Sequence, residues 1–427
     1  MPLRRRRAET LGLWDATAMA IGGMVGGGIF TVLGVAVSLA GHLAFGCFLI
    51  GAVLAALTAR SFAVLAKGSG RSGGLFDYLR DAGHPELAAL VSWLLCLGYV
   101  LALAVYSFTF GHYVADLGGF GPLGADVAAV SVLAVFLAIN LRGVALSATS
   151  EDLIVAAKLL VLGGVAAIGL TRFDADRFRP LANEGGSGVL LGAAAIFVAY
   201  EGFELLSFDY DDLRDPARTY PSATLISVSV VSALYVLVTI GSQSLVADRL
   251  LVEQKEIAFA EVGRAALGPS GRWVAALAAI LATSSAVHAT LFSTARLVRQ
   301  ISHAGELPHW FGLQRRGLPV NALVVLAVAG ALAGLLPNLE LILGFASLAF
   351  LCVFVVVNLL ALRTTGRRAA AWSPVLAASG CLGAIGLLLY ELGTENPLSL
   401  VAIAATALVV AAIRWAFVRR RAARTDR

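Results

Sequence analysis

Residues 21–30 read Ile-Gly-Gly-Met-Val-Gly-Gly-Gly-Ile-Phe, inside an apolar stretch long enough to cross a membrane as a helix. Five of the seven residues from Gly22 to Gly28 are glycine, and each costs about 1 kcal/mol relative to alanine in a helix interior. We therefore expect the helix to stop, unwind and restart here. Lipid cannot satisfy the freed N–H and C=O groups, so they must line a protein cavity. Such a cavity can bind a small polar solute.

The composition is that of an integral membrane protein. Of the 427 residues, 59% are hydrophobic and 14% are charged, against about 25% charged in soluble domains. Apolar stretches of about 20 residues, the length that crosses a bilayer, occupy most of the chain. We expect twelve spans, at 12–38, 42–66, 87–115, 124–141, 151–170, 188–208, 222–246, 272–300, 319–337, 340–362, 373–392 and 397–418.

The basic residues predict the orientation of the chain. Most of the 32 Lys and Arg residues fall in segments that are cytoplasmic if the N-terminus is inside, the basic ends 1–11 and 419–427 among them. We expect both termini in the cytoplasm, with the protein in a prokaryotic plasma membrane. The net charge of +5 follows from this bias and requires no nucleic-acid partner.

The sequence lacks the motifs of catalytic and metal sites. It has no HExxH, GxSxG or phosphate-loop motif, and its six histidines do not have metal-ligand spacing. The four cysteines all fall in apolar spans and form no CxxC pair. We therefore expect a protein that is not an enzyme and needs no metal or organic cofactor.

A second span is interrupted five spans after the first. It contains Phe-Val-Ala-Tyr-Glu-Gly-Phe-Glu at 197–204, so that Glu201 and Glu204 place two carboxylates beside a glycine. A charge at mid-span costs about 2.5–3.5 kcal/mol even on a lenient scale. Interruptions at corresponding positions of two five-span halves predict an inverted repeat with a binding site between the halves.

The glycine segment has two interpretations. Gly22 with Gly26 and Gly23 with Gly27 have the GxxxG spacing of closely packed helices. The three consecutive glycines at 26–28 exceed what packing needs, and the N-terminus of a half-helix there would direct N–H groups at a carboxylate. Carbonyls at the second break would face an ammonium group. Together the two breaks would bind a zwitterion.

The longest segment between spans, at about 247–271, carries charges at helix-like spacing and ends at Gly268-Pro269. It is either an extracellular lid helix or a solvated amphipathic loop. The sequence favours neither interpretation.

Several stretches resemble the amino acid–polyamine–organocation (APC) transporter superfamily. Residues 22–30 are similar to the glycine signature of its first span, and residues 71–78 to the segment after span 2. Residues 197–221 resemble the sixth span with its exit loop, and residues 296–308 the end of span 8. The resemblance covers residues 12–310 in the order found in the family.

The resemblance implies an all-α, LeuT-like fold with ten core spans in two inverted five-span repeats, plus two added spans. It also implies alternating access around an amino-acid site in mid-membrane. The expected division is a basic N-terminus at 1–11, a first repeat at 12–170, a second repeat at 171–362, two further spans at 363–418 and a basic tail at 419–427.

The resemblance further implies the substrate contacts. By motif position, Met24, Gly27 and Gly28 would meet the carboxylate, and Val198 and Glu201 would offer carbonyls to the amino group. Gly23, Gly26 and Phe203 complete the expected substrate-binding residues. Family members often carry an aromatic gate where this chain has Val198, and Phe197, Tyr200 or Phe203 could take its place. The Glu201 side chain could favour a cationic substrate, although its carbonyl is the simpler contact. Glu204 matches an acidic position of the family, with a structural or a proton-handling role.

Lys158 lies well inside the fifth expected span, whereas the other two lysines fall in loops. Snorkelling to the surface is one interpretation. A buried lysine can also exist in its neutral form, and some proton-coupled members of the family carry a lysine where sodium-coupled relatives bind the ion. The resemblance then implies contacts with the backbone of span 1, at Gly22, and with hydroxyls of span 8, at Thr283, Ser284 or Ser285.

We therefore expect a proton-coupled amino acid importer with protons as the coupling ion. An amino acid or polyamine exchanger, and a non-transporting sensor with a transporter fold, are the alternatives. The expected partners are a small-molecule amino acid or amine and the lipid bilayer. The sequence fixes neither the side chain of the substrate nor the oligomeric state.

Overall fold

The computed structural model describes residues 11–142, 148–178, 186–315, 317–336, 338–365 and 371–395, with single positions at 397, 400, 401 and 405. These residues are largely helical. The longer helices are α1 (Leu13–Met24), α2 (Gly28–Ala40), α3 (Ala44–Ser69), α5 (Pro85–Gly118), α6 (Pro122–Leu141), α7 (Ala148–Thr171), α8 (Gly186–Ala195), α9 (Pro216–Leu245), α11 (Ala258–His303), α13 (Val320–Gly334), α14 (Leu339–Thr365) and α15 (Trp372–Glu395). Short helices connect them: η1 (Gly41–Leu43), α4 (Gly74–Asp81), η2 (Ala175–Phe178), η3 (Phe197–Tyr200), η4 (Phe203–Asp212), α10 (Asp248–Glu253), η5 (Lys255–Ile257) and α12 (His309–Gly312).

The helices support a multi-pass membrane protein. Within the described residues, eight helical segments are long and apolar enough to cross a membrane, and the bent pair of α8 with η3 and η4 would make a ninth. Each of the first eleven expected spans coincides with an apolar helix or pair of helices, although α13 has only 15 residues. The twelfth, at 397–418, falls almost entirely outside the described residues. The count of twelve and the division into repeats stay predictions.

The first span is interrupted where its glycines lie. α1 ends at Met24, residues 25–27 form a turn, and α2 begins at Gly28. The unwinding expected from the glycine content is therefore present.

The second break differs in form from a simple unwound segment. α8 ends at Ala195, and the chain continues as the 3₁₀ segments η3 and η4, bent by 55° from α8. Gly202, with φ of 118°, separates the two segments. The tighter 3₁₀ winding changes which backbone groups are paired, because each N–H reaches back three residues instead of four.

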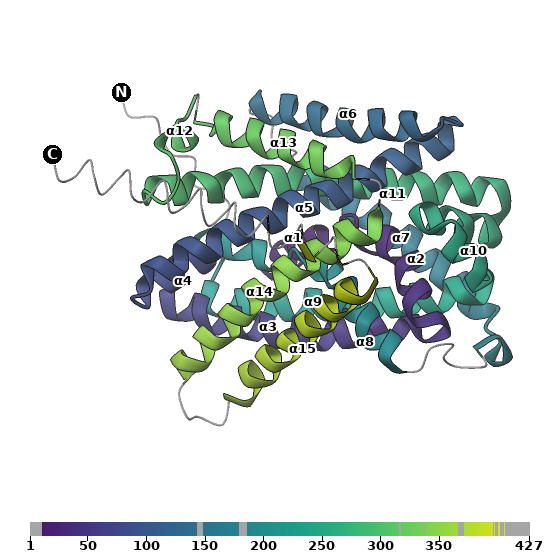
Figure 1. Ribbon diagram of the computed structural model, residues 1–427, viewed down its shortest axis with the longest axis horizontal. Coiled ribbons are helices and arrows are strands. Elements are labelled where there is room, and N and C mark those ends of the chain that lie inside the picture. Colours follow the sequence, from purple (N-terminus) through teal and green to yellow (C-terminus); the bar gives the residue numbers. More distant parts are fainter. Residues whose placement is uncertain are drawn as a thin grey trace.

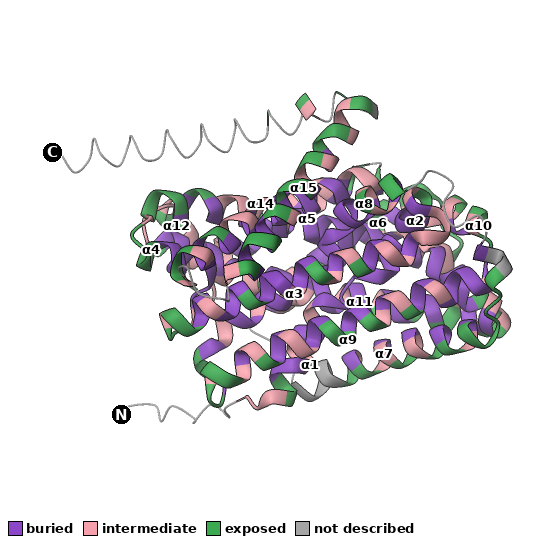
Figure 2. Ribbon diagram, turned by 90° about the horizontal axis from the view of Figure 1, so that it is seen from below, coloured by how far each residue is buried: buried purple, intermediate pink, exposed green. Residues whose placement is uncertain are grey.

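The long helices lie side by side around α1. α11 packs on α5, α3 packs on α9, and α1 contacts α7, α9, α11 and η4. In Figure 1, α4 and α12 lie at one end of this bundle and α10 at the other. Figure 2 shows the buried residues along the interior. Large apolar side chains such as Leu123 and Leu160 are about three-quarters exposed, as expected for surfaces that face lipid.

The segment predicted as a lid or a loop is helical. It forms α10, η5 and the first part of α11, which is kinked at Leu267 and Gly268. α10 and η5 both pack against α2. The segment therefore covers the second half of the broken first span.

Candidate binding site at the two helix breaks

The two breaks touch through their backbones. A Cβ atom on Gly202 would lie 2.6 Å from the carbonyl carbon of Gly23 and 2.8 Å from the amide nitrogen of Met24. A Cβ on Gly23 would lie 3.1 Å from the carbonyl oxygen of Gly202. The crossing therefore requires a glycine at 202 and leaves little space for a side chain at 23, and the sequence supplies a glycine in each break.

The consecutive glycines admit side chains from three other helices. A Cβ on Gly26 would lie 2.5 Å from the Ala286 side chain of α11, and one on Gly28 would lie 2.5 Å from the Tyr235 hydroxyl of α9. A Cβ on Gly27 would overlap the ring of Tyr106 from α5. Close packing is therefore one role of these glycines.

Side chains from two other helices cap the end of α1. The Nζ atom of Lys158, on α7, donates to the carbonyl oxygen of Gly22 at 3.0 Å. The hydroxyl of Tyr235, on α9, donates to the carbonyl oxygen of Met24 at 2.9 Å. Carbonyls at a helix C-terminus lack partners in their own helix and carry partial negative charge. A cation and a hydroxyl donor thus satisfy carbonyls at the C-terminal end of α1.

Lys158 is buried, with 1% of its surface exposed. Its ammonium group therefore does not reach the membrane surface, and the snorkelling interpretation is wrong for this structure. The Gly22 contact is the span 1 contact that the resemblance implied. The Thr283 hydroxyl donates within its own helix, to Ala279 at 2.8 Å. Contacts of Lys158 with Ser284 and Ser285, which are half-buried and buried on α11, stay a prediction.

Both carboxylates of the second break are buried and contact tyrosines of α5. Oε2 of Glu201 accepts from the Tyr106 hydroxyl at 2.7 Å, while its Oε1 atom has no hydrogen-bond partner in the described part of the chain. Oε2 of Glu204 accepts from the Gly202 amide at 2.9 Å and its Oε1 from the Tyr99 hydroxyl at 3.2 Å. Glu204 therefore caps the start of η4, which is a structural role.

A serine of α14 bridges the second break. The Ser347 hydroxyl donates to the Ala195 carbonyl at 2.7 Å and accepts from the Val198 amide at 3.0 Å. The Val198 carbonyl, expected to contact the substrate, accepts from the Glu201 amide at 3.0 Å. A carbonyl oxygen has two lone pairs, so it can still accept a second hydrogen bond.

The aromatic residues of the second break pack toward α3 and α14. The Phe203 ring lies 5.9 Å from that of Phe62 and 5.7 Å from that of Phe354. Phe197 also contacts Phe354, at 5.7 Å, and the Tyr200 hydroxyl donates to the Phe48 carbonyl at 2.7 Å. These rings belong to the core in this structure, and a substrate contact of Phe203 stays a prediction.

The region between the breaks is closed to solvent. Met24, Val198, Glu201 and Phe203 are each at most 3% exposed. Toward α10, the Phe30 ring packs edge-on against Phe259 at 5.1 Å. The structure therefore represents a closed state of the site.

Sequence reasoning missed four polar residues of this region: Tyr99, Tyr106, Tyr235 and Ser347. Each carries a hydroxyl group within an apolar span, and this is the feature by which the sequence could have indicated them. The signal is weak because α5 alone contains five tyrosine or serine residues that are buried, and only the folded arrangement shows which ones reach the breaks.

No metal-binding group is visible in the described residues, where no three His, Cys, Asp or Glu side chains are placed to hold an ion. The polar groups at the breaks are instead backbone amides, carbonyls and single side chains. Such a set can bind a small organic solute through hydrogen bonds.

Comparisons with known proteins identify the family of the chain. The family described as "Amino acid permease" matches residues 11–427. An uncharacterized transporter of Mycobacterium tuberculosis is 30% identical over 435 residues, covering 99% of this chain and 94% of the relative. The methylthioribose transporter of Bacillus subtilis is 26% identical, and the match covers 82% of this chain and 80% of the relative. Cationic amino acid transporter 1 of Arabidopsis thaliana is 25% identical, and the match covers 83% of this chain and 63% of the relative. The chain therefore belongs to the amino acid permease family of the APC superfamily and is a membrane transporter rather than an enzyme.

Proposed function

We propose that the chain imports amino acids by alternating access and couples this uptake to protons, with its N-terminus in the cytoplasm. The observation that carries the proposal is the buried contact between the Lys158 ammonium group and the Gly22 carbonyl at the first break. Family membership supports transport, and the basic ends of the chain support the orientation.

The substrate would be held at both ends by backbone groups. The N-terminus of α2 begins at Gly28, and the first amides of a helix have no carbonyl partners in their own helix. Together with the positive end of the helix dipole they suit a carboxylate. Carbonyls of the second break, including that of Val198, suit the ammonium group. Every amino acid shares these two groups.

The protonation state of Lys158 would determine how strongly its side chain holds the end of α1. A cation at a helix C-terminus stabilises by about 0.3–1 kcal/mol, and by up to about 2 kcal/mol in partly buried geometries. A neutral amine still donates a hydrogen bond but loses this charge–dipole attraction. Deprotonation would therefore loosen α7 from the end of α1 and favour a rearrangement of the break.

The proton gradient supplies enough free energy for accumulation. One proton crossing about 100 mV releases roughly 2.3 kcal/mol, and one pH unit adds about 1.4 kcal/mol. The sum of about 3.7 kcal/mol supports an accumulation of several hundredfold for a net-neutral solute, because each 1.4 kcal/mol is a factor of ten.

Uptake by proteoliposomes tests the coupling. We expect an inward proton gradient to drive amino acid uptake, Lys158→Ala to abolish that response, and the matched variant Lys67→Ala, at an exposed lysine of α3, to retain it. Gradient-driven uptake that is unchanged in Lys158→Ala would refute the role of the lysine. Uptake that requires internal substrate regardless of the gradient would instead identify an exchanger, and binding without flux a sensor.

A second substrate class, cationic amino acids, is favoured by one observation. The buried Oε1 atom of Glu201 has no partner in the described residues, and an unpaired buried acceptor costs about 1–3 kcal/mol. A substrate with a second ammonium group could satisfy it. A thermal-shift screen against the twenty amino acids and common polyamines tests this, because a ligand of the folded state raises its stability. Glu201→Gln should then weaken the response to lysine more than the response to alanine.

A further inference from the structure

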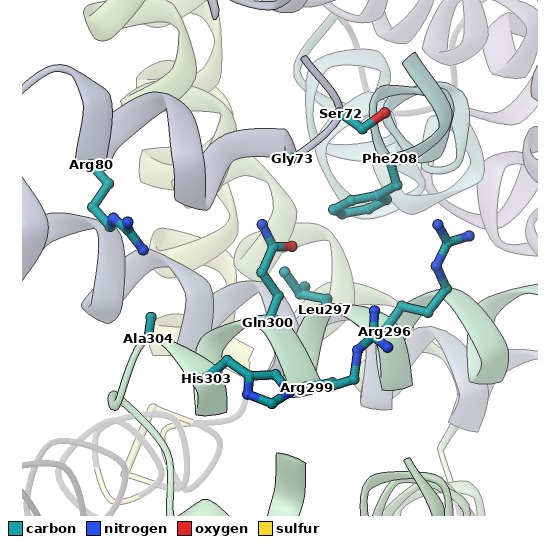
Figure 3. Close-up of a pocket in the computed structure, with 10 residues that line it drawn as sticks. All are labelled: Ser72, Gly73, Arg80, Phe208, Arg296, Leu297, Arg299, Gln300, His303 and Ala304. Carbon is teal, nitrogen blue, oxygen red and sulfur yellow. The ribbon is translucent and has the colours of Figure 1, made fainter. Parts of the chain in front are cut away.

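A cavity of about 600 Å³ lies away from the helix breaks, at the end of the bundle where α1 begins. There the backbone of Leu11 pairs with Asp212 and Arg214. The cavity is bounded by the loop before α4, by η4 and by the last turns of α11. In Figure 3, Arg80 reaches in from α4, while Arg299 and His303 extend from α11.

The lining of the cavity is basic. Arg80, Arg296, Arg299 and His303 contribute to it, and no Asp or Glu is among its lining residues. Arg296 is paired with Asp209 at 3.2 Å. In the part of the chain that the structure describes, Arg80 and Arg299 have no carboxylate within 4 Å, and the contact of Arg80 is with the ring of Phe76, at 5.8 Å.

Two carboxylates lie near the cavity without lining it. Asp77 accepts a hydrogen bond from Gln300 and also interacts electrostatically with Arg80, and Asp81 is paired with Arg71 at 2.7 Å. Among the described residues neither carboxylate forms an ion pair with Arg80 or Arg299, so the guanidinium N–H donors of both stay available to a ligand.

A second cavity of about 360 Å³ adjoins the first and shares Arg80 and His303 with it. Glu306 contributes to this second cavity and not to the first. Arg296 and Arg299 therefore line only the larger cavity, whereas Arg80 and His303 lie at its boundary with the smaller one.

This lining selects the ligand by charge. The ammonium group of a zwitterionic amino acid would find no carboxylate partner in the larger cavity, so the space suits an anion without a positive group. Planar guanidinium groups bind phosphate through paired N–H donors. A volume of about 600 Å³ is within the range of small-molecule sites, about 300–1,000 Å³.

We propose that this cavity is a binding site for a phosphate-bearing anion, held between Arg80 of α4 and Arg299 of α11. On the proposed orientation it opens to the cytoplasm. The phosphate belongs either to a soluble compound or to the headgroup of a membrane lipid. The site is independent of the transport proposal, because binding can be measured without any flux.

Calorimetric titration with inorganic pyrophosphate tests the site on the full chain in phosphatidylcholine nanodiscs. We expect saturable binding at matched ionic strength, and an affinity that falls by about tenfold or more in the double variant Arg80→Gln/Arg299→Gln. Arg218→Gln is the matched control, since Arg218 lies exposed at the start of α9 and does not line the cavity. Its affinity should stay within about twofold of the parent.

Two further arms keep the result interpretable. Arg299→Lys retains the charge but loses the planar fork, so its affinity should fall between those of the parent and the double variant. In nanodiscs that contain phosphatidylglycerol, retained pyrophosphate binding identifies a soluble ligand, whereas loss of binding identifies competition by the lipid headgroup. The proposal is overturned if the parent protein binds no pyrophosphate in phosphatidylcholine, or if the double variant binds it as tightly as Arg218→Gln does.

Discussion

Replacing Gly202 by alanine tests whether the two helix breaks depend on direct backbone contact. Gly202 has φ of 118°, in a region that side chains rarely tolerate. Its new Cβ atom would also lie 2.6 Å from the carbonyl carbon of Gly23 and 2.8 Å from the Met24 amide. Both are backbone atoms in a crossing of two segments, so no side-chain rotation can relieve the overlap.

The expected cost has two parts. A residue held in a sparsely populated φ/ψ region costs about 1–3 kcal/mol, and an added methyl group in a packed core costs about 1–3 kcal/mol more. Gly70 offers a control, because its φ is 65° and no atom lies within 4 Å of its Cβ position. Gly70→Ala should therefore cost only the conformational part, about 1–2 kcal/mol. The difference between the variants therefore combines the contact between the breaks with any greater backbone strain at the φ of 118°.

Thermal unfolding of the purified protein in detergent ranks these variants, and ligand-induced stabilisation reports the site. We expect Gly202→Ala to unfold at a lower temperature than Gly70→Ala and to lose its stabilisation by amino acids. Gly70→Ala should keep that stabilisation. Equal unfolding temperatures with intact ligand response in both variants would refute the inferred contact.

Three further predictions concern single polar groups. Tyr235→Phe removes the hydroxyl donor from the end of α1 and should destabilise by about 1–3 kcal/mol, whereas Tyr390→Phe, at a 70% exposed tyrosine, should leave the unfolding temperature unchanged. Ser347→Ala leaves an amide and a carbonyl of the second break unpaired and should cost about 2–4 kcal/mol of stability. The control Ser131→Ala, at an exposed serine, should cause no measurable change. Equal unfolding temperatures for the two variants would contradict the bridge. Burial raises the pKa of Asp77, so stability should fall as pH rises from the ordinary carboxyl pKa through the raised one. Asp77→Asn should remove that fall in a pH series of unfolding temperatures, and an unchanged pH profile would contradict it.

The backbone of the site could be predicted from the sequence because its signals are local. Glycines at 22–28 are costly in a helix wherever the rest of the chain lies, and the break between Met24 and Gly28 follows from that cost alone. Lys158 was recognisable because a lysine within an apolar span needs a specific partner. The hydrophobic lengths similarly predicted where each described apolar helix lies.

The partners of the breaks could not be predicted in the same way. Tyr235 and Ser347 are two of many hydroxyls in apolar spans, and their importance depends on which spans converge in the fold. Phe203 shows the same difficulty, since its substrate contact stays a prediction while its ring packs against Phe62 and Phe354 in this structure. A single sequence carries no signal that orients a side chain toward one neighbouring helix instead of another.

The capping of α1 connects the fold to the proposed mechanism. Lys158 and Tyr235 reach the last carbonyls of α1 from two different helices, so α1 cannot move away from either without losing a buried hydrogen bond. For a charged lysine the lost hydrogen bond is a charge-assisted one, worth about 1.5–3 kcal/mol. For the neutral amine it is an ordinary one, worth about 0.5–1.5 kcal/mol. Loss of the proton therefore lowers the barrier to moving α1, and in the proposed function this difference is what would link the state of Lys158 to the opening of the site.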